Sequence, residues 1–464
     1  MIIKNKKLIL GLVSASILWS CQLTEPERHG VFVGGQILNT SHTYVKIFKD
    51  NDLIDSIGLD AQGRFQIQFD SLENGVYSLE HLPNIQPLFL EKGDSLWIRI
   101  NASDFEESLV FSGIGASKNN FLIELALEMN QENSYLSNFY AQNPTIFRSI
   151  IDSLQALKED KFRSFQSQTA LSPETVLVTQ AAYRYPYATR LERYALLRGT
   201  HWDSSQRDSF FTFRDSLNLK ESRLAYFNPY VSYLMNYLNQ KALDSGQAYF
   251  QTKSKTAFNL QRLNVIDRNI QSQQLRNILA RAVAFEEILN FDNHENHELF
   301  LSYYLSLNSS AKYAAEIIGF HDNIENLQAG RVLPEVQLTN LDGEKVSSDE
   351  LFTGQTTVLY FWSQSQMPYL KKSRDRIAQF QEQFPAVRFV GICLQPLSPM
   401  VKEVFEMMEI DSQHHYALSD FQQASEQWVI TLLNKAILIQ GDGKLINGFA
   451  NFAADDWISL LKNY

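Results

Sequence analysis

The chain has 464 residues, which is too long for one hydrophobic core and predicts two or three domains. Hydrophobic residues make up 44% of it and aromatic residues 12%, which excludes a largely disordered chain. The formal net charge of −11 argues against nucleic acid as a partner, since phosphate binding needs a basic face.

The first residues have the pattern of a lipoprotein signal peptide. Three lysines precede a short apolar stretch (residues 8–19), and residues 18–21, Leu-Trp-Ser-Cys, resemble a bacterial lipobox. We predict a signal peptide over 1–20, acylation of Cys21 and a polar tether over 21–30. The alternative is an ordinary signal peptide, or an uncleaved anchor, that happens to contain a cysteine. With Cys21 acylated, Cys393 is the one remaining thiol, and no intramolecular disulfide can form.

Residues 31–115 alternate between apolar and polar side chains with a period of two, and turn sequences such as 60–63 (Asp-Ala-Gln-Gly) separate the alternating runs. We predict several short strands in a small antiparallel sandwich or barrel. The phrases 63–65 (Gly-Arg-Phe), 89–94 (Phe-Leu-Glu-Lys-Gly-Asp) and 111–113 (Phe-Ser-Gly) are similar to the β-rich N-terminal domains of lipoproteins from Bacteroidetes-type bacteria. This resemblance implies no activity.

From residue 116 to 328 the apolar period becomes helical, as in the stripe that begins at Phe147, Ile150 and Ile151. Ser172-Pro173 is a helix start, with a capping hydroxyl and a proline in the first turn. Aromatic side chains at helical spacing are interpreted as core, and the alternative is a ligand-binding groove. These aromatic residues are Tyr183, Tyr185, Tyr187, Tyr226, Phe227, Tyr230, Tyr233 and Tyr237.

The C-terminal part, residues 329–464, is organised around the segment 356–369. The apolar run 358–361 predicts a strand buried on both faces, followed by a polar loop and a helix. Phe361-Trp362 and Pro368 match the Phe-Trp strand end and the Trp-Cys-x-Pro-Cys loop of membrane-anchored TlpA/ResA-type thiol-disulfide oxidoreductases, which are AhpC/TSA-related. The chain therefore resembles their thioredoxin-like domains, and the resemblance implies the element order β-α-β-α-β-β-α.

The same resemblance shows which parts of the redox site are missing. The two cysteine positions hold Gln366 and Tyr369, and neither side chain can attack or resolve a disulfide. The family's cis-proline corresponds to Asn434, where we expect a trans bond and an altered substrate shelf. Trp362, Pro368 and these three residues are degenerate redox-site positions, and no catalytic residue is predicted.

The remaining candidates for chemistry are a thiol and two histidine pairs. Cys393 ends an apolar strand, where a thiol is normally an inert core residue. His294 and His297 lack the further ligands of a metal site and are interpreted as a polar turn, and His414-His415 as an exposed loop before a strand. No phosphate-binding glycine loop and no Gly-x-Ser-x-Gly motif is present, so we expect neither a cofactor nor a metal.

The prediction is a multidomain α+β protein with an N-terminal antiparallel β module (31–115), a helical middle (116–328) and a C-terminal thioredoxin-like α/β domain (329–464). We expect a lipoprotein of the cell envelope, on the periplasmic face or the surface of the outer membrane, that binds or scaffolds a protein or peptide. The rival interpretation is a thiol-disulfide oxidoreductase or a peroxiredoxin-like antioxidant enzyme. The missing pair of cysteines separates the two.

Overall fold

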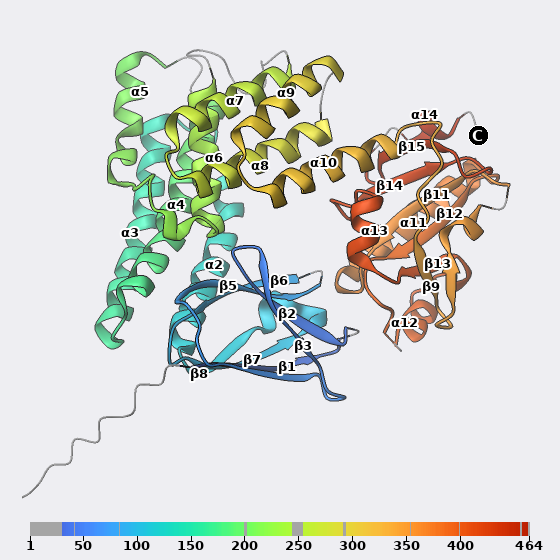
Figure 1. The fold of residues 1–464 in the computed structure, drawn as a ribbon, viewed down its shortest axis with the longest axis horizontal. Coiled ribbons are helices and arrows are strands. Elements are labelled where there is room, and N and C mark those ends of the chain that lie inside the picture. Colours follow the sequence, from blue (N-terminus) through green and yellow to red (C-terminus); the bar gives the residue numbers. More distant parts are fainter. Residues whose placement is uncertain are drawn as a thin grey trace, which may run out of the picture.

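The computed structural model describes residues 30–462 except 41, 83, 199–201, 244–253, 291–293, 353, 399 and 455–456. The predicted signal peptide and its lipidation site, Cys21, lie outside the described residues. A β domain, a helical region and an α/β domain follow one another along the chain, and the helical region bridges the other two (Figure 1). No helix within the described ranges is long and apolar enough to cross a bilayer.

The β domain consists of two four-stranded sheets packed face to face, with the orders β4-β1-β7-β8 and β3-β2-β5-β6. β1 and β7 pair in parallel, so the prediction of a purely antiparallel module was wrong at this pair. Both strands lie inside one sheet and are separated in sequence by the whole second sheet, which makes the parallel crossover possible. The elements are β1 (Val31–Leu38), β2 (Tyr44–Lys49), β3 (Asp52–Gly58), β4 (Arg64–Phe69), β5 (Gly75–His81), β6 (Asn84–Leu90), β7 (Ser95–Asn101), η1 (Ala102–Asp104), α1 (Phe105–Ser108) and β8 (Val110–Ile114).

The alternating sequence explains why these strands pack as a sandwich. The inward positions of β1, β2 and β7 are apolar and almost completely buried, as at Val33, Ile47 and Leu96. Burying a side chain of this size contributes roughly 1.5–3 kcal/mol relative to leaving it exposed. The tight turn between β3 and β4 needs a left-handed residue at Gly63, with φ +71, where a Cβ would lie 2.2 Å from the Ile37 carbonyl oxygen.

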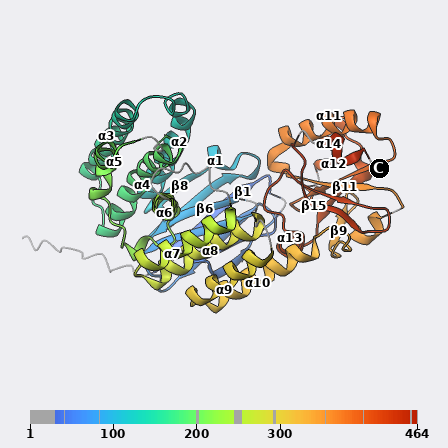
Figure 2. The same ribbon diagram turned by 90° about the horizontal axis from the view of Figure 1, so that it is seen from above.

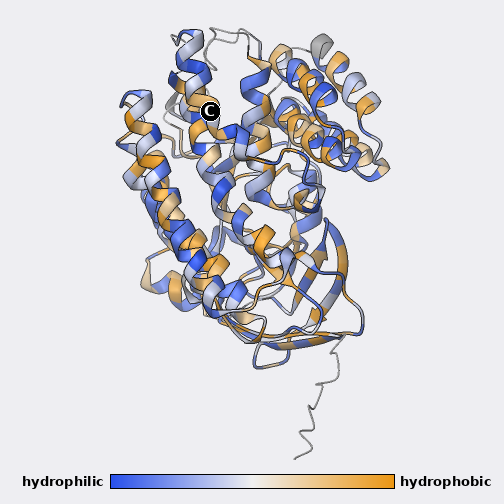
Figure 3. Cartoon of the chain, turned by 90° about the vertical axis from the view of Figure 1, so that its left-hand side faces the viewer, coloured by the Kyte–Doolittle hydropathy of each residue, from blue (hydrophilic) through white to orange (hydrophobic). Residues whose placement is uncertain are grey.

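The helical region begins at Ala116, directly after β8. Apolar and polar residues are interspersed along its helices (Figure 3). Asn143, Ser254 and Ser310 accept hydrogen bonds from backbone amides at the starts of three of them. The α-helices are α2 (Ala116–Ser137), α3 (Pro144–Gln168), α4 (Pro173–Arg198), α5 (Ser204–Phe210), α6 (Asn228–Ala242), α7 (Lys255–Asn269), α8 (Gln273–Asn290), α9 (His294–Leu307) and α10 (Ala311–Asn326), with 3-10 turns η3 (Phe211–Ser216) and η4 (Ser222–Leu224).

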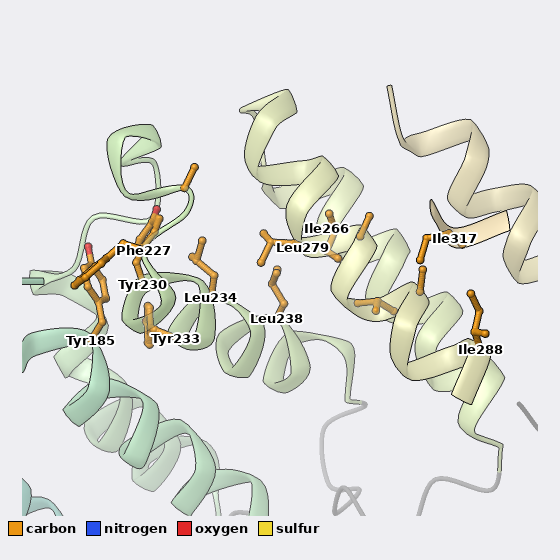
Figure 4. Packing of buried hydrophobic residues seen from close by; sticks show 14 of the residues in the cluster. Tyr185, Phe227, Tyr230, Tyr233, Leu234, Leu238, Ile266, Leu279, Ile288 and Ile317 are labelled. Carbon is orange, nitrogen blue, oxygen red and sulfur yellow. The ribbon is translucent and has the colours of Figure 1, made fainter. Parts of the chain in front are cut away.

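The aromatic side chains of this region form its core. Tyr183, Tyr187, Tyr230 and Tyr233 are completely buried, and Tyr185 packs edge-on against Tyr230 with ring centroids 4.8 Å apart. The apolar cluster continues from these tyrosines through α7 and α8 to α10 (Figure 4). The interpretation of the aromatic residues as core therefore holds for the buried tyrosines and Phe227, while Tyr226 and Tyr237 are partly exposed and pack against this core.

The α/β domain contains a seven-stranded sheet with the order β10-β9-β13-β12-β11-β14-β15. β11, β12 and β13 are parallel, and β14 and β15 are antiparallel to their neighbours. The elements of the predicted order β-α-β-α-β-β-α are all present from β11 onward, but β13 and α13 are inserted between α12 and β14. The elements are β9 (Gln337–Asn340), β10 (Lys345–Ser347), η6 (Ser348–Leu351), β11 (Thr357–Trp362), η7 (Gln364–Gln366), α11 (Met367–Gln383), β12 (Arg388–Cys393), α12 (Val401–Met407), η8 (Ser412–His414), β13 (His415–Leu418), α13 (Phe421–Gln427), β14 (Lys435–Ile439), β15 (Leu445–Asn451) and α14 (Trp457–Leu461).

The helical region joins this sheet without a flexible linker. Val332 pairs with Lys444 in a β-bridge, and the Gly330 amide donates to the Leu445 carbonyl oxygen at 2.7 Å. Gly448 lets β15 approach the end of α10 closely, because a Cβ there would lie 2.3 Å from the Leu327 carbonyl oxygen. Seen from above, α10 leads directly into the α/β domain (Figure 2).

Candidate functional site

The loop after β11 lies where an α/β fold usually places its chemistry. Every residue of β11 is buried, and the strand ends at Trp362. The helix α11 then begins at Met367, with Pro368 in its first turn, where a missing amide costs nothing. Because β14 is antiparallel to β11, with Tyr360 opposite Ala436, Asn434 lies at this same edge of the sheet.

The two positions that would carry a redox pair hold side chains of different chemistry. Gln366 and Pro368 are exposed, and Gln366 is the N-cap residue of α11 but makes no side-chain capping bond. Tyr369 is half-buried, and burial raises the pKa of its phenol. Trp362 is completely buried and packs against Phe405, with ring centroids 5.4 Å apart. None of these groups can act as the attacking thiolate that disulfide exchange requires.

Cys393 is the only cysteine among the described residues, and it is completely buried. It is the register partner of Trp362 on the neighbouring parallel strand. Burial raises the pKa of the Cys393 thiol to about 12. The thiol therefore stays protonated at neutral pH and has no access to a substrate.

Amide side chains tie together the two loops that follow β11 and β12. The Ser363 hydroxyl and the Gln364 backbone amide both donate to Gln395 Oε1, at 3.0 and 2.8 Å. Gln364 Nε2 donates to the Pro396 carbonyl oxygen at 2.7 Å, and the Ser398 amide donates to Gln364 Oε1 at 3.0 Å. This network holds both loops in one arrangement. No motif in the sequence marks it, since isolated glutamines carry no pattern.

Asn434 is the residue that the sequence resemblance aligns with the family's cis-proline. Its side-chain amide donates to Asn451 Oδ1 at 3.0 Å, and its carbonyl oxygen accepts from the Phe452 amide at 2.6 Å. The backbone carbonyl is thus engaged by the chain itself. Leu432, two residues earlier, is 65% exposed.

Lys435 is a feature that the sequence interpretation missed. Its side chain is 7% exposed, and no group in the described parts of the chain hydrogen-bonds its Nζ atom. The amine lies over the Phe449 ring at 4.3 Å from the centroid, and burial lowers its pKa to about 7. The signal was a lysine at an inward position of the otherwise apolar strand Lys-Ala-Ile-Leu-Ile.

The loop at Gln366 lies beside the N-terminal β domain. The turn η1 (Ala102–Asp104) is in contact with η7 (Gln364–Gln366), although more than 250 residues separate them in sequence. The chain's own β domain therefore occupies part of the space that a substrate would approach at this loop.

Two pockets of the α/β domain lie between the β9–β10 hairpin and α12. One pocket of about 460 Å³ is lined by residues that follow β12 and β13, including Ser398 and Ser419. A second, of about 500 Å³, is lined by Phe405 and Tyr416. The two share the hairpin turn and Lys402, whose Nζ pairs with Asp342 at 2.6 Å. Both volumes are typical of ligand pockets.

Two predictions about histidines were wrong. His297 is not in a polar turn: it lies on α9, is completely buried and stacks on His321, with Nε2 3.1 Å from His321 Nδ1. His415 is not exposed: it begins β13, and its Nε2 lies 2.8 Å from the Tyr360 hydroxyl in the core. Both face inward because their neighbours on the same strand or helix face are apolar.

Within the described ranges, no group of three or more His, Cys, Asp or Glu side chains is arranged to hold a metal ion.

No family model matches the chain, and no curated protein matches it. Among solved structures, the thioredoxin domain of a thiol-disulfide oxidoreductase from Bacteroides vulgatus is 20% identical, with a TM-score of 0.26 and coverage of 30% of this chain and 97% of that chain. A thiol-disulfide oxidoreductase from Bacteroides fragilis is 20% identical, with a TM-score of 0.22 and coverage of 28% and 95%. The strand order and crossovers of residues 337–451 do not depend on these comparisons, and they are those of a thioredoxin-like domain.

Proposed function

We propose that the protein is a cell-envelope lipoprotein whose thioredoxin-like domain binds a protein or peptide and does not exchange disulfides. The observation that carries this proposal is the placement of Cys393, which is completely buried in the sheet. The sequence resemblance aligns Gln366 and Tyr369, and no cysteine, with the redox positions. Disulfide exchange and peroxide reduction both need a thiolate that a substrate can reach. The described part of the chain has no accessible thiol that could serve the rival oxidoreductase function.

The groove between the β9–β10 hairpin and α12 is the binding site that we propose. It lies at the carboxyl ends of β12 and β13, where α/β proteins usually hold ligands. The loop at Gln366 is less suitable, because η1 lies against it and the Asn434 carbonyl oxygen is already bonded to the Phe452 amide.

A binding assay with a matched pair of variants tests this site. Peptides would be selected from a random library on the full-length protein, and their affinities measured by fluorescence anisotropy. Ser419→Arg, which fills the groove, should weaken binding about tenfold or more, as expected for a change at the centre of an interface. Gln422→Arg adds the same charge at an exposed position of α13 and should leave binding unchanged. Equal affinities for both variants would contradict the proposed site.

The membrane anchor rests on the lipobox at residues 18–21. Each acyl methylene buried in a bilayer adds roughly 0.8 kcal/mol of membrane affinity. Cys21→Ser should therefore move the protein from the membrane fraction to the soluble fraction of cells. Retention of the variant in membranes after a high-salt wash would show that another segment provides the anchor.

A further inference from the structure

One face of the β domain is turned away from the rest of the chain. It is the outward side of the sheet β4-β1-β7-β8, and we call it the outer face. The pairing registers place its residues in rows across the sheet, because Gly34 is opposite both Trp97 and Gln66, and Trp97 is opposite Ser112. In the view of Figure 1, β1, β7 and β8 lie along the lower side of the molecule, away from helices α5 to α9.

The outer face carries large apolar side chains that nothing in the described chain covers. Trp97, Val110 and Ile114 are 47%, 55% and 51% exposed. Phe32 packs against Trp97, with ring centroids 5.2 Å apart. Single exposed apolar residues are ordinary, but these side chains come from three adjacent strands of one sheet.

The charge of the outer face differs from that of the whole chain. Arg99 is exposed on it, and Arg64, which is also exposed, pairs with Asp60 at 2.7 Å in the turn before β4. The other polar residues that point outward are glutamine, serine and asparagine. None of the residues of these four strands, all of which the structure describes, is an aspartate or glutamate. The chain as a whole has a formal net charge of −11. The outer face can therefore approach an anionic surface, whereas the negative charge of the remainder of the protein would be repelled by that surface.

The proposed membrane tether enters the β domain at this same face. The first described residue, Gly30, lies at the start of β1 and beside Gln68 on β4. Phe32, Ile114 and Gln68 belong to the row of the outer face nearest to it. The nine residues 22–30 span at most about 30 Å when fully extended, so an acyl chain on Cys21 would hold the face close to a bilayer.

We propose that the outer face rests on the surface of a phospholipid bilayer, with Trp97, Phe32 and Ile114 among the headgroups and Arg99 facing lipid phosphates. This inference rests on the proposed lipid anchor at Cys21. Tryptophan suits this depth because its ring is apolar and its N–H can bond to headgroups or water. Arginine near an anionic leaflet is attracted over roughly a Debye length, about 8 Å at physiological salt.

Site-specific labelling can locate the face relative to the bilayer. Cys393 is completely buried, so a single new cysteine can be labelled with an environment-sensitive fluorophore in the native lipoprotein. Ser112→Cys places the label on the outer face, and Ser205→Cys places it on α5, at the opposite end of the molecule (Figure 1). The labelled full chain would be reconstituted into vesicles of phosphatidylethanolamine and phosphatidylglycerol. We expect a blue shift, and quenching by lipid-phase quenchers, at position 112 and not at 205.

Each other outcome overturns a defined part of the account. If the protein stays with the vesicles but position 112 remains in water, the docking inference is wrong and the anchor stands. If the protein does not associate with vesicles at all, the anchor is wrong. A blue shift at 112 that appears without lipid and grows with protein concentration would mean that a second copy covers the face.

A pair of double variants tests whether the apolar residues themselves make the contact. Trp97→Glu with Ile114→Glu should lower the lipid quenching at position 112 by about tenfold, since buried apolar area and charge both determine interfacial binding. The control, Leu53→Glu with Ile85→Glu, changes apolar residues of the other sheet that are 53% and 57% exposed. It should leave the lipid quenching at position 112 unchanged. Equal quenching in both double variants would contradict the proposal, and thermal unfolding would verify that both are folded.

Discussion

Trp362 and Cys393 are register partners on the neighbouring parallel strands β11 and β12, and both side chains are completely buried. The thiol therefore lies in the core beneath the loop that would carry redox chemistry, and not at its surface. Trp362 ends the strand, and the loop after it carries Gln366 and Tyr369 and no cysteine.

The burial of Cys393 predicts that its thiol does not react in the folded protein. Its pKa of about 12 leaves almost no thiolate at neutral pH. N-ethylmaleimide should give no adduct on Cys393 in native protein by mass spectrometry and complete modification in guanidinium. Native labelling at a rate close to that of the denatured protein would contradict the buried position.

The buried amine of Lys435 predicts an unusual dependence of stability on pH. Burial lowers its pKa from 10.5 to about 7 in the folded protein. The unfolded chain therefore binds more protons between these two values, and the free energy of unfolding should rise with pH across that window.

Lys435→Met should abolish that rise. It should also increase the free energy of unfolding below pH 7 by on the order of 2 kcal/mol, because the variant no longer buries a charge. Loss of the contact with the Phe449 ring offsets part of this gain. Urea unfolding at one pH below and one above the window measures both effects, and a variant less stable at both would contradict them.

A buried ion pair in the helical region gives a prediction about stability. Arg214 donates two hydrogen bonds to the Glu192 carboxylate, at 2.7 and 2.6 Å, and Glu192 is completely buried. Burial raises the pKa of Glu192, and Arg214 acts against that shift. Arg214→Met leaves the carboxylate without its cation and should cost about 3–5 kcal/mol. Adding Glu192→Leu should recover most of this loss, as measured by urea unfolding. A double variant that is no more stable than Arg214→Met alone would contradict the prediction.

Introducing a cysteine pair tests whether the absence of thiols alone prevents disulfide chemistry. Gln366→Cys with Tyr369→Cys places two thiols one turn apart at the start of α11, where a disulfide can close. The first thiol should have a pKa below the ordinary value of about 8.5, owing to the helix amides. Turnover should stay low, because η1 lies beside the loop and position 434, which the resemblance aligns with a cis-proline, holds an asparagine.

Adding Asn434→Pro should raise the turnover of the double variant further. If the folded double-cysteine variant fails to close its disulfide under mild oxidation, the thioredoxin-like local geometry is wrong. If it already works as well as the triple variant, only the argument about Asn434 fails.

The sequence predicted the elements whose periodicity is strong and missed those fixed by distant contacts. The apolar run at Val358 identifies the central strand without any knowledge of its neighbours. The parallel pairing of β1 with β7 could not be foreseen, because alternation specifies a strand's faces and not its partner.

Some features of the candidate site could likewise be predicted from the sequence, and others could not. The absence of cysteine at Gln366 and Tyr369 could be predicted from the sequence, since the resemblance to a motif specifies these two positions. The burial of Lys435, His297 and His415 could not be predicted. A polar residue in a sequence does not show whether its helix or strand will pack it inward. The contact of η1 with η7 likewise depends on how two domains meet.

The most direct test of the account is reduction of insulin disulfides by dithiothreitol in the presence of the purified protein. Because the described chain holds no accessible thiol, we predict that precipitation of the insulin B chain is no faster than with dithiothreitol alone. Turnover well above that blank, abolished by Cys393→Ser, would contradict the claim that this thioredoxin-like domain has no disulfide chemistry.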